Sequence, residues 1–137
     1  MKRTSAADFS ATMRIYWEDT DAAGIVFYAN YLKFFERART EWLRSLGLNQ
    51  SELCQSEGGF FVVSETGLRY RRPARLDDQI DVSVAVVHLG QASLEIAQEA
   101  RRAGELLADG TIRIGCVELG TFRPCRIPND IRLSIHR

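Results

Sequence analysis

The sequence predicts an α+β domain in which one antiparallel sheet packs on a single long helix. Three observations predict it. The hydrophobic period changes to that of a helix at about Tyr31. From Phe60 onward, apolar and polar residues alternate instead, as in strands with one buried face. Glycine-containing turns at 89–91 and 103–105 divide this second half, which is typical of a meander of hairpins.

Length and composition indicate one domain with a core of its own. The chain has 137 residues, 45% of them hydrophobic, and a formal net charge of zero. A neutral chain lacks the basic field that attracts nucleic acid. No apolar run is long enough to span a membrane, and the basic N-terminus lacks the apolar stretch of a signal peptide. We expect residues 1–10 to form a flexible tail and residues 11–137 a single domain.

The three cysteines point to a compartment rather than to a site. Cys54, Cys116 and Cys125 are odd in number and widely spaced, which matches neither a disulfide framework nor a paired metal-ligand motif. We therefore expect a reducing, cytoplasmic location. The sequence also lacks the HExxH motif, the Walker loop and the dinucleotide glycine fingerprint. We expect no metal and no cofactor.

A short β-compatible segment at about 11–17 leads toward the long helix. Asn30 is a good N-cap residue for this helix, and Gly47 supplies its C-terminal stop. One broad apolar face carries Tyr31, Phe34, Phe35, Ala38, Trp42 and Leu46. A short second helix is expected at 49–57.

About four strands follow, and their parity assigns the buried side chains. They are expected at 60–72, 80–86, 92–100 and 106–116, with a helical turn at 129–135. Pro73 ends the first of them. In the last strand one parity is shared by Leu106, Ala108, Ile112, Ile114 and Cys116. Such a sheet keeps open edges, so we expect the chain to form oligomers.

The segment from Glu18 to Tyr31 is the most informative for function, because it places three carboxylates in four positions ahead of a glycine turn and the helix. Asp21 is the sharpest candidate. One interpretation is a turn or cap residue that accepts backbone hydrogen bonds. The other is a catalytic carboxylate, made more basic by Glu18 and Asp19 and by a poorly hydrated position beside the apolar segment 25–27. Glu18 and Asp19 themselves are expected to be solvated charges.

Backbone groups at the helix start complete the candidate site. The N–H of Tyr28 has no intrahelical partner and can point at a substrate oxygen, whereas the Tyr28 ring is expected to anchor the helix in the core. Gly24 either lets the chain approach a ligand closely or satisfies a positive φ. A carboxylate facing such N–H donors suits acyl-group chemistry: one group attacks or activates water and the other stabilises a carbonyl oxyanion.

Other charged residues carry weaker signals. Arg69, Arg71, Arg72 and Arg75 form the only basic run, which is either a solvated strand face or a site for phosphates. His88 and His136 neighbour no nucleophile motif, so solvated or capping roles are expected for both.

At this point the segment from Asp19 to Leu43 resembles a known family. It reads DTDAAGIVFYANYLKFFERARTEWL. This is similar to the hotdog-fold acyl-CoA thioesterases, in the branch of 4-hydroxybenzoyl-CoA thioesterase and the Tol-Pal-associated (YbgC-like) proteins. The resemblance extends through 61–63, 70–78 and 126–128, and so covers nearly the whole chain after the first ten residues.

The resemblance implies a hotdog fold, with the sheet wrapped around the long helix, and assembly into homodimers and often homotetramers. It implies hydrolysis of an acyl-CoA to a free acid and CoA, with Asp21 as the catalytic carboxylate and the N–H of Tyr28 polarising the thioester carbonyl. Whether Asp21 attacks the carbonyl or deprotonates water is open. No cofactor is implied, since CoA is part of the substrate.

Substrate contacts are expected at Gly24, Ile25, Val26, Phe61, Val62, Val63 and Arg72. Many Tol-Pal-associated members carry His where this chain has Tyr28, and a tyrosine there is similar to the hydroxybenzoyl-CoA type. Two alternatives remain: a hotdog dehydratase or hydratase, which would use a histidine as well, and a non-catalytic acyl-CoA-binding module. Cell-envelope Tol-Pal or lipid-synthesis proteins are the partners that the resemblance implies.

Overall fold

The structure is a computed structural model, and it describes residues 7–48 and 59–135. In chain order its elements are β1 (Phe9–Arg14), η1 (Trp17–Asp19), η2 (Tyr28–Asn30), α1 (Tyr31–Ser45), β2 (Gly59–Tyr70), β3 (Gln79–Leu89), β4 (Ser93–Arg102), β5 (Glu105–Glu118) and α3 (Asn129–Ile135). The short helix predicted at 49–57 lies outside the described residues.

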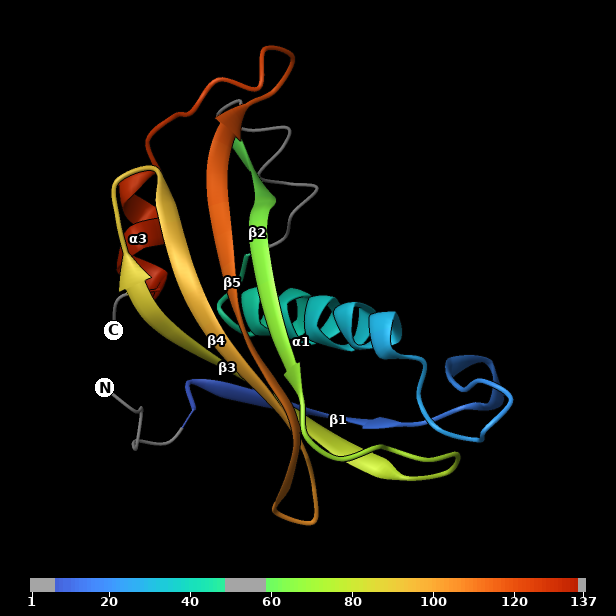
Figure 1. Ribbon diagram of the computed structural model, residues 1–137. Coiled ribbons are helices and arrows are strands. Elements are labelled where there is room, and N and C mark those ends of the chain that lie inside the picture. Colours follow the sequence, from blue (N-terminus) through green and yellow to red (C-terminus); the bar gives the residue numbers. More distant parts are fainter. Residues whose placement is uncertain (1–6, 49–58, 136–137) are drawn as a thin grey trace.

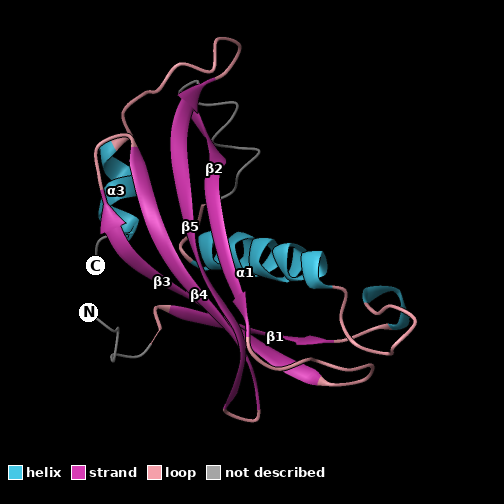
Figure 2. Ribbon diagram, in the orientation of Figure 1, coloured by secondary structure: helices cyan, strands magenta, loops and turns pink. Residues whose placement is uncertain are grey.

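One sheet holds all five strands, in the order β1-β3-β4-β5-β2, and every neighbouring pair is antiparallel. Figures 1 and 2 show this sheet bending around α1, while α3 lies near the turn that joins β3 and β4. The predicted order of a strand, a long helix and four strands is confirmed, as is the helical turn at the C-terminal end. β1 and β2 form the two edges of the sheet.

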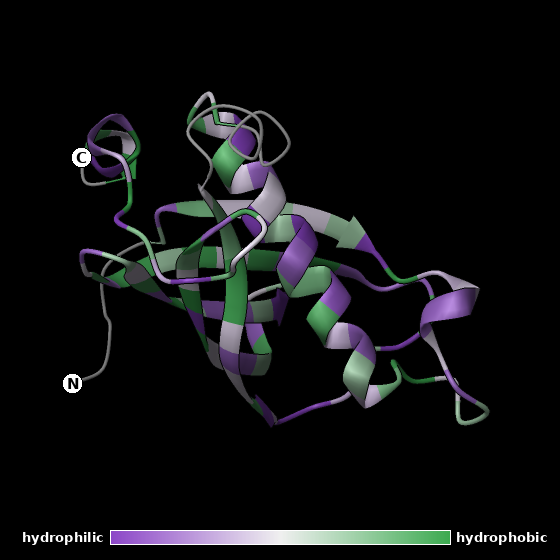
Figure 3. Ribbon diagram, turned by 90° about the horizontal axis from the view of Figure 1, so that it is seen from above, coloured by the Kyte–Doolittle hydropathy of each residue, from purple (hydrophilic) through white to green (hydrophobic). Residues whose placement is uncertain are grey.

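The helix α1 buries one face against the sheet. Its buried residues are Tyr31, Phe34, Phe35, Ala38, Trp42 and Leu43. Apolar and polar bands alternate along α1 in Figure 3, as expected of a helix with one buried stripe. Phe34 and Phe35 are fully buried, and each contributes roughly 1.5–3 kcal/mol of hydrophobic stabilisation. Gly47, with a φ of +81°, ends the helix as predicted.

The strand bounds differ from the predicted ones by a few residues, and the differences in β1 and β5 have a clear cause. β1 begins at Phe9, inside the segment expected to be a tail, because Phe9 pairs with Val84 and the Asp8 N–H donates to the Val84 carbonyl at 2.9 Å. In β5, Leu107 is fully buried at the position predicted for Leu106. The register between β4 and β5 shifts at Ala100/Arg101, so strict alternation does not extend through the hairpin.

Gln98 is the one fully buried amide among the described residues, and it joins α1 to the sheet. It lies on β4 on the same face as Ile96 and Ala100. Its Nε2 donates to the carbonyl of Phe35 at 3.1 Å and of Ser83 at 3.2 Å, and its Oε1 accepts from Arg39 Nη1 at 2.9 Å. These bonds satisfy a polar group that would otherwise cost several kcal/mol to bury.

Candidate active site

Asp21 opens a tight turn that projects beyond the sheet. The turn is closed by the bridge between Thr20 and Val26, by the Asp21 N–H donating to the Ile25 carbonyl at 3.0 Å, and by the Gly24 N–H donating to the Asp21 carbonyl at 2.9 Å. Gly24 has a φ of +77°, a conformation that side chains rarely adopt. The sequence AAG after Asp21 therefore folds the chain straight back toward the helix start.

The Asp21 carboxylate is exposed on the single chain. Its Oδ1 accepts a hydrogen bond from the Ala23 N–H at 2.9 Å, as in an Asx turn. It also lines an open hollow, together with Trp17, Thr20, Ala22, Gly24 and Leu76. The predicted poorly hydrated position is therefore wrong for the isolated chain, although one oxygen of the carboxylate remains free to meet a ligand in this hollow.

The start of the helix presents free backbone donors. Tyr28 and Ala29 begin η2, which runs directly into α1. Within the described residues, no oxygen accepts the N–H of Tyr28 or of Ala29, whereas the next N–H, of Asn30, donates to the Phe27 carbonyl. Unpaired N–H groups at the positive end of a helix can bind an anionic oxygen. The predicted donor at Tyr28 is thus available.

A buried pair joins the acidic turn to the helix, and sequence reasoning missed it. Asp19 was expected to be solvated, but it is only 5% exposed. Its Oδ2 accepts from the Tyr16 N–H and its Oδ1 from the Asn30 amide, both at 2.8 Å. Asn30 is the residue before α1, yet its side chain makes no cap hydrogen bond. This pair holds the segment before Asp21 against the helix start.

An aromatic hollow lies beside the helix start. It is lined by Ile25, Val26, Tyr28, Tyr31, Tyr70, Arg71, Arg72 and Pro73. The Tyr70 ring lies 6.2 Å from the Tyr28 ring and 5.6 Å from the Tyr31 ring, measured between centroids. Tyr28 is 64% exposed, so its ring does not anchor the core as expected, and the buried Tyr31 does so instead. Burial raises the pKa of both Tyr31 and Tyr70, which keeps both phenols protonated at pH 7.

The arginine run is divided between paired and unpaired side chains. Arg71 pairs with Asp109 at 2.6 Å, and Arg72 with Glu105 at 3.0 Å. Within the described part of the chain, the guanidinium groups of Arg69 and Arg75 have no ion-pair partner. Neither of the two interpretations of this run, a solvated strand face or a phosphate site, describes all four arginines, because two of them form ion pairs.

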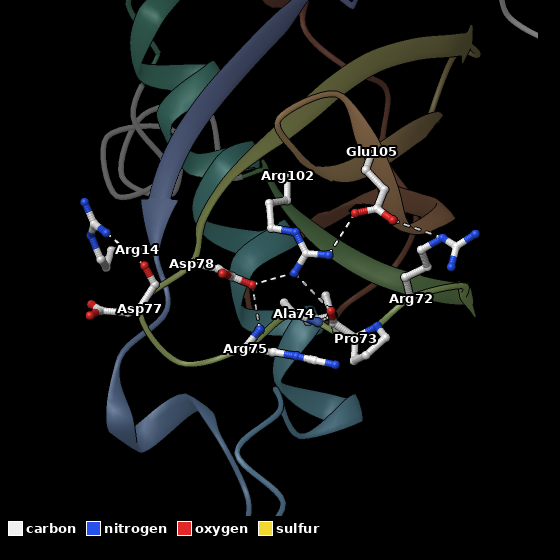
Figure 4. Close-up of polar contacts among 10 residues, drawn as sticks. Arg14, Arg72, Pro73, Ala74, Arg75, Asp77, Asp78, Arg102 and Glu105 are labelled. Atoms are coloured by element: carbon white, nitrogen blue, oxygen red, sulfur yellow. Dashed lines mark hydrogen bonds and ion pairs between the residues drawn. The ribbon is translucent and has the colours of Figure 1, made fainter.

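Arg102, which sequence analysis did not single out, organises the segment that carries Arg72 and Arg75. Its guanidinium contacts Asp78 at 2.6 Å, Glu105 at 2.8 Å and the Pro73 carbonyl at 3.3 Å. Figure 4 shows Arg102 between Asp78 and Glu105, with Arg72 beyond Glu105. The same segment reaches the site, because the Ala74 carbonyl accepts the Val26 N–H at 2.8 Å and the Ala74 N–H donates to the Tyr31 hydroxyl at 3.4 Å.

The three β2 residues predicted to contact substrate lie in a different groove. Phe61, Val62 and Val63 line it with Glu36, Arg39, Thr40, Trp42, Leu43, Leu94, Ile114 and Ile135. None of these residues lines either of the hollows next to Asp21 and Tyr28. The structure thus brings Ile25, Val26, Tyr28 and Arg72 together in one hollow. It places Asp21 and Gly24 in a second hollow and 61–63 in the separate groove.

Comparison with known proteins decides the family. The family model described as "Thioesterase-like superfamily" matches residues 15–135, a range that includes the acidic turn, α1, β2 to β5 and α3. The chain belongs to this superfamily. It is 38% identical over 128 residues to a protein of Haemophilus influenzae named "Acyl-CoA thioesterase YbgC", covering 93% of this chain and 94% of the relative.

Solved structures agree with this family. A crystal structure from Bartonella henselae described as "Probable Thioesterase" is 30% identical, covers 87% of this chain and 98% of its own, and superposes with a TM-score of 0.83. The structure of a gentisyl-coenzyme A thioesterase is 28% identical, covers 92% of this chain and 98% of its own, and also has a TM-score of 0.83. The predicted hotdog fold and the thioesterase resemblance are confirmed.

Proposed function

We propose that this protein is an acyl-CoA thioesterase, which hydrolyses an acyl-CoA thioester to a free acid and CoA. The observation that carries the proposal is the match to a relative named as an acyl-CoA thioesterase over 93% of this chain. The superfamily match, from 15 to 135, includes the whole Asp21 turn and the helix start.

The chemistry follows from the groups at the turn and the helix start. A thioester carbonyl is electrophilic and a thiolate leaves readily, so a carboxylate and N–H donors suffice. The free N–H groups of Tyr28 and Ala29 would stabilise the oxyanion that develops on the carbonyl oxygen. Asp21 would either attack the carbonyl carbon or take a proton from the attacking water. In both routes the free carboxylate oxygen is the reacting atom.

The decisive experiment replaces Asp21 and measures thiol release from a panel of acyl-CoAs. Asp21→Asn should lower kcat by about 10²–10⁴-fold. The melting temperature should not change, because the side chain is exposed and bonded only within its turn. Glu18→Gln, an exposed carboxylate three residues earlier, is the matched control and should stay within about twofold. Retained turnover in Asp21→Asn would refute its role. A wild-type protein that binds acyl-CoA without releasing thiol would be a binding module instead.

For the acyl group we propose an aromatic acid of the hydroxybenzoyl kind. Tyr28, Tyr31 and Tyr70 line the hollow beside the helix start, and aromatic rings favour offset or edge contacts with other rings. The solved gentisyl-coenzyme A thioesterase also takes an aromatic acyl group by its name. The proposal requires kcat/KM for 4-hydroxybenzoyl-CoA to exceed that for hexanoyl-CoA and palmitoyl-CoA. Preference for either alkyl chain would contradict it.

We propose that the arginine run binds the CoA phosphates, and that Arg75 contributes more to this binding than Arg72. Arg75 is exposed and unpaired within the described residues, whereas Arg72 must exchange Glu105 for a phosphate. Arg75→Ala should raise KM more than it lowers kcat, and Arg71→Ala, at an arginine held by Asp109, should change KM less. An unchanged KM in Arg75→Ala would contradict phosphate binding by this arginine and indicate that it is only a solvated charge.

We also propose a homodimer or homotetramer. Asp21 is exposed on the single chain, and β2 presents a twelve-residue edge strand with Val63 and Tyr70 exposed. A second copy that covers these surfaces would dry the site. Light scattering should give a mass of two or four chains, and kcat should fall on dilution below the dissociation constant. A monomer with full activity would contradict this proposal.

The remaining predictions concern the setting of the reaction. We propose that hydrolysis needs no cofactor besides the CoA of the substrate, so dialysis against a chelator should leave kcat unchanged. No helix in the described part of the chain is long and apolar enough to cross a membrane. A cytoplasmic location and a link to Tol-Pal or lipid-synthesis proteins stay predictions.

A hydratase is disfavoured because His88, exposed on β3, lines none of the three hollows, and His136 lies outside the described residues.

A further inference from the structure

Two cysteines that the sequence places apart meet at the end of β5. The Sγ atoms of Cys116 and Cys125 lie 3.4 Å from each other. Cys116 is buried in β5, and Cys125 is partly exposed in the segment that follows this strand. Neither thiol lines the hollows near Asp21 and Tyr28, so the proposed thioesterase chemistry uses neither of them.

The backbone segments that carry the two thiols pair with each other as antiparallel strands do. The Cys125 N–H donates to the Cys116 carbonyl at 2.9 Å, and the neighbouring residues Val117 and Pro124 form an antiparallel bridge. Residues facing each other in antiparallel pairs have Cα atoms about 4.5–5.5 Å apart. Disulfides span Cα separations of about 4.4–6.8 Å. We therefore expect side-chain rotation to close the gap between the sulfur atoms, with the backbone pairing kept.

A glycine leaves room for both sulfur atoms. A Cβ added at Gly59 of β2 would lie 3.2 Å from Cys125 Sγ and 3.3 Å from Cys116 Sγ. Both thiols therefore point into the same small space, which a side chain at this position would fill. The absence of a Cβ at 59 keeps the two sulfur atoms free to rotate toward each other.

The positively charged residues near Cys125 in sequence favour an anionic reagent. Arg123 and Arg126 flank it in sequence, and both are exposed. Cations near a thiol attract an anionic partner. Cys116 has the opposite environment: burial first, and then the hydrogen bond and charge of Cys125, raise the pKa of its thiol to about 12. Cys125 is thus the more accessible of the two thiols, and the buried Cys116 would react second.

We propose that Cys116 and Cys125 form a modification site that reacts with anionic low-molecular-weight disulfides, such as glutathione disulfide, and closes to an intramolecular disulfide. First, the Cys125 thiolate attacks one sulfur of glutathione disulfide, the S–S bond breaks, and one glutathione leaves as thiolate. Then Cys116 loses its proton, its sulfur attacks Cys125 Sγ, and the second glutathione leaves. The protein loses two protons and two electrons, and glutathione disulfide is reduced to two glutathiones.

The new bond would tie the C-terminal segment to the sheet. Beyond Cys125, Ile127 is fully buried and its N–H donates to the Gln91 carbonyl at 2.8 Å, and Ile131 of α3 is buried as well. A bond between 116 and 125 closes a short loop, which restricts the unfolded chain. Oxidation should therefore raise the melting temperature by roughly 5 °C. This outcome does not depend on the thioesterase proposal.

The test uses the 137-residue chain with Cys54→Ser, so that the pair holds its only thiols. Incubation of the folded protein with glutathione disulfide should yield a product that has lost two hydrogens and carries no glutathione. Its digest should contain a peptide linking Cys116 to Cys125. Glutathione disulfide should react faster than the neutral hydroxyethyl disulfide at equal concentration.

Single-cysteine variants separate the two steps. With Cys116→Ala added, Cys125 should accumulate one glutathione adduct, and with Cys125→Ala added, Cys116 should stay reduced. Gly59→Ala should slow closure without changing the first adduct, since its Cβ meets both sulfur atoms. The proposal is overturned if the folded protein with both cysteines stops at a glutathione adduct, or stays reduced while the denatured protein oxidises. Equal rates with the anionic and the neutral disulfide would show that the arginines do not select an anionic reagent.

Discussion

The side-chain amide of Asn30 donates a 2.8 Å hydrogen bond to Oδ1 of Asp19, and both residues are buried. The bond joins the residue before α1 to the end of η1, eleven positions earlier. The main chain of Asp19 makes a second link, because its carbonyl accepts the Phe27 N–H at 3.1 Å. These two bonds span the loop that contains Asp21, so they set where the carboxylate lies relative to the helix start.

Asn30→Ala should therefore lower both stability and activity. It leaves a buried carboxylate oxygen unpaired, which costs about 1–3 kcal/mol in the free energy of unfolding. Urea unfolding measures this loss, and kcat for an acyl-CoA should fall with it. Asn30→Asp is the sharper variant, because it keeps the size, removes the donor and adds a like charge. If Asn30→Asp were more stable than Asn30→Ala at pH 7, the amide would not be acting as the donor to Asp19.

The backbone N–H of Tyr28 can be removed without removing a protein hydrogen bond. Tyr28 is the first residue of η2, a position where proline is favoured, and Phe27 before it has a ψ of 131°, which proline tolerates in its predecessor. Tyr28→Pro should lower kcat by about 10²–10³-fold while the melting temperature stays close to that of Tyr28→Ala.

Tyr28→Ala and Tyr28→Phe keep the N–H and serve as side-chain controls. Tyr28→Phe should lose little activity, because the exposed phenol has no assigned part in the reaction. A kcat for Tyr28→Pro equal to that of Tyr28→Ala would place the oxyanion donor elsewhere. A large loss in Tyr28→Phe would show instead that the phenol takes part.

The elements with a local periodic signal were predictable from the sequence. The stripe of α1 and the alternation in β3 each depend on side chains a few residues apart, so the pattern is written in the chain. The contacts that were missed join distant positions. Gln98 bonds to the Phe35 carbonyl across 63 residues, and Cys125 reaches Cys116 only because the chain turns back along β5. Asp19 shows the same limit. Its neighbours in sequence predict a solvated side chain, but its hydrogen bond with Asn30, eleven residues later, buries it.

Asp78 should make stability depend on acid pH. Burial acts to raise the pKa of this carboxyl, but the Arg75 N–H and the Arg102 guanidinium outweigh burial and hold it below its ordinary value. A carboxyl with a lowered pKa in the folded state stabilises the fold at pH values above its unfolded pKa, about 3.9, and this contribution is lost as the pH falls through the folded pKa. Asp78→Asn should thus cost about 1–2 kcal/mol at pH 7 and less on acidification below about pH 4. Parallel stability curves for the two proteins would contradict this assignment.

Gly110 tests how closely β5 and β2 approach each other. A Cβ at this position would lie 2.5 Å from the Gly67 carbonyl oxygen and would collide with Leu68 Cδ2, so backbone as well as side chain would have to move. Gly110→Ala should therefore destabilise the fold by about 1–3 kcal/mol. Gly115→Ala is the matched control on the same strand, because nothing lies within 4 Å of its added Cβ, and its effect should stay within about 0.5 kcal/mol. Urea unfolding of both variants gives the comparison. The Phe35 ring also lies 3.4 Å from the added Cβ at 110. Equal stabilities of Gly110→Ala and Gly115→Ala would mean that β2 and β5 can move apart at little cost.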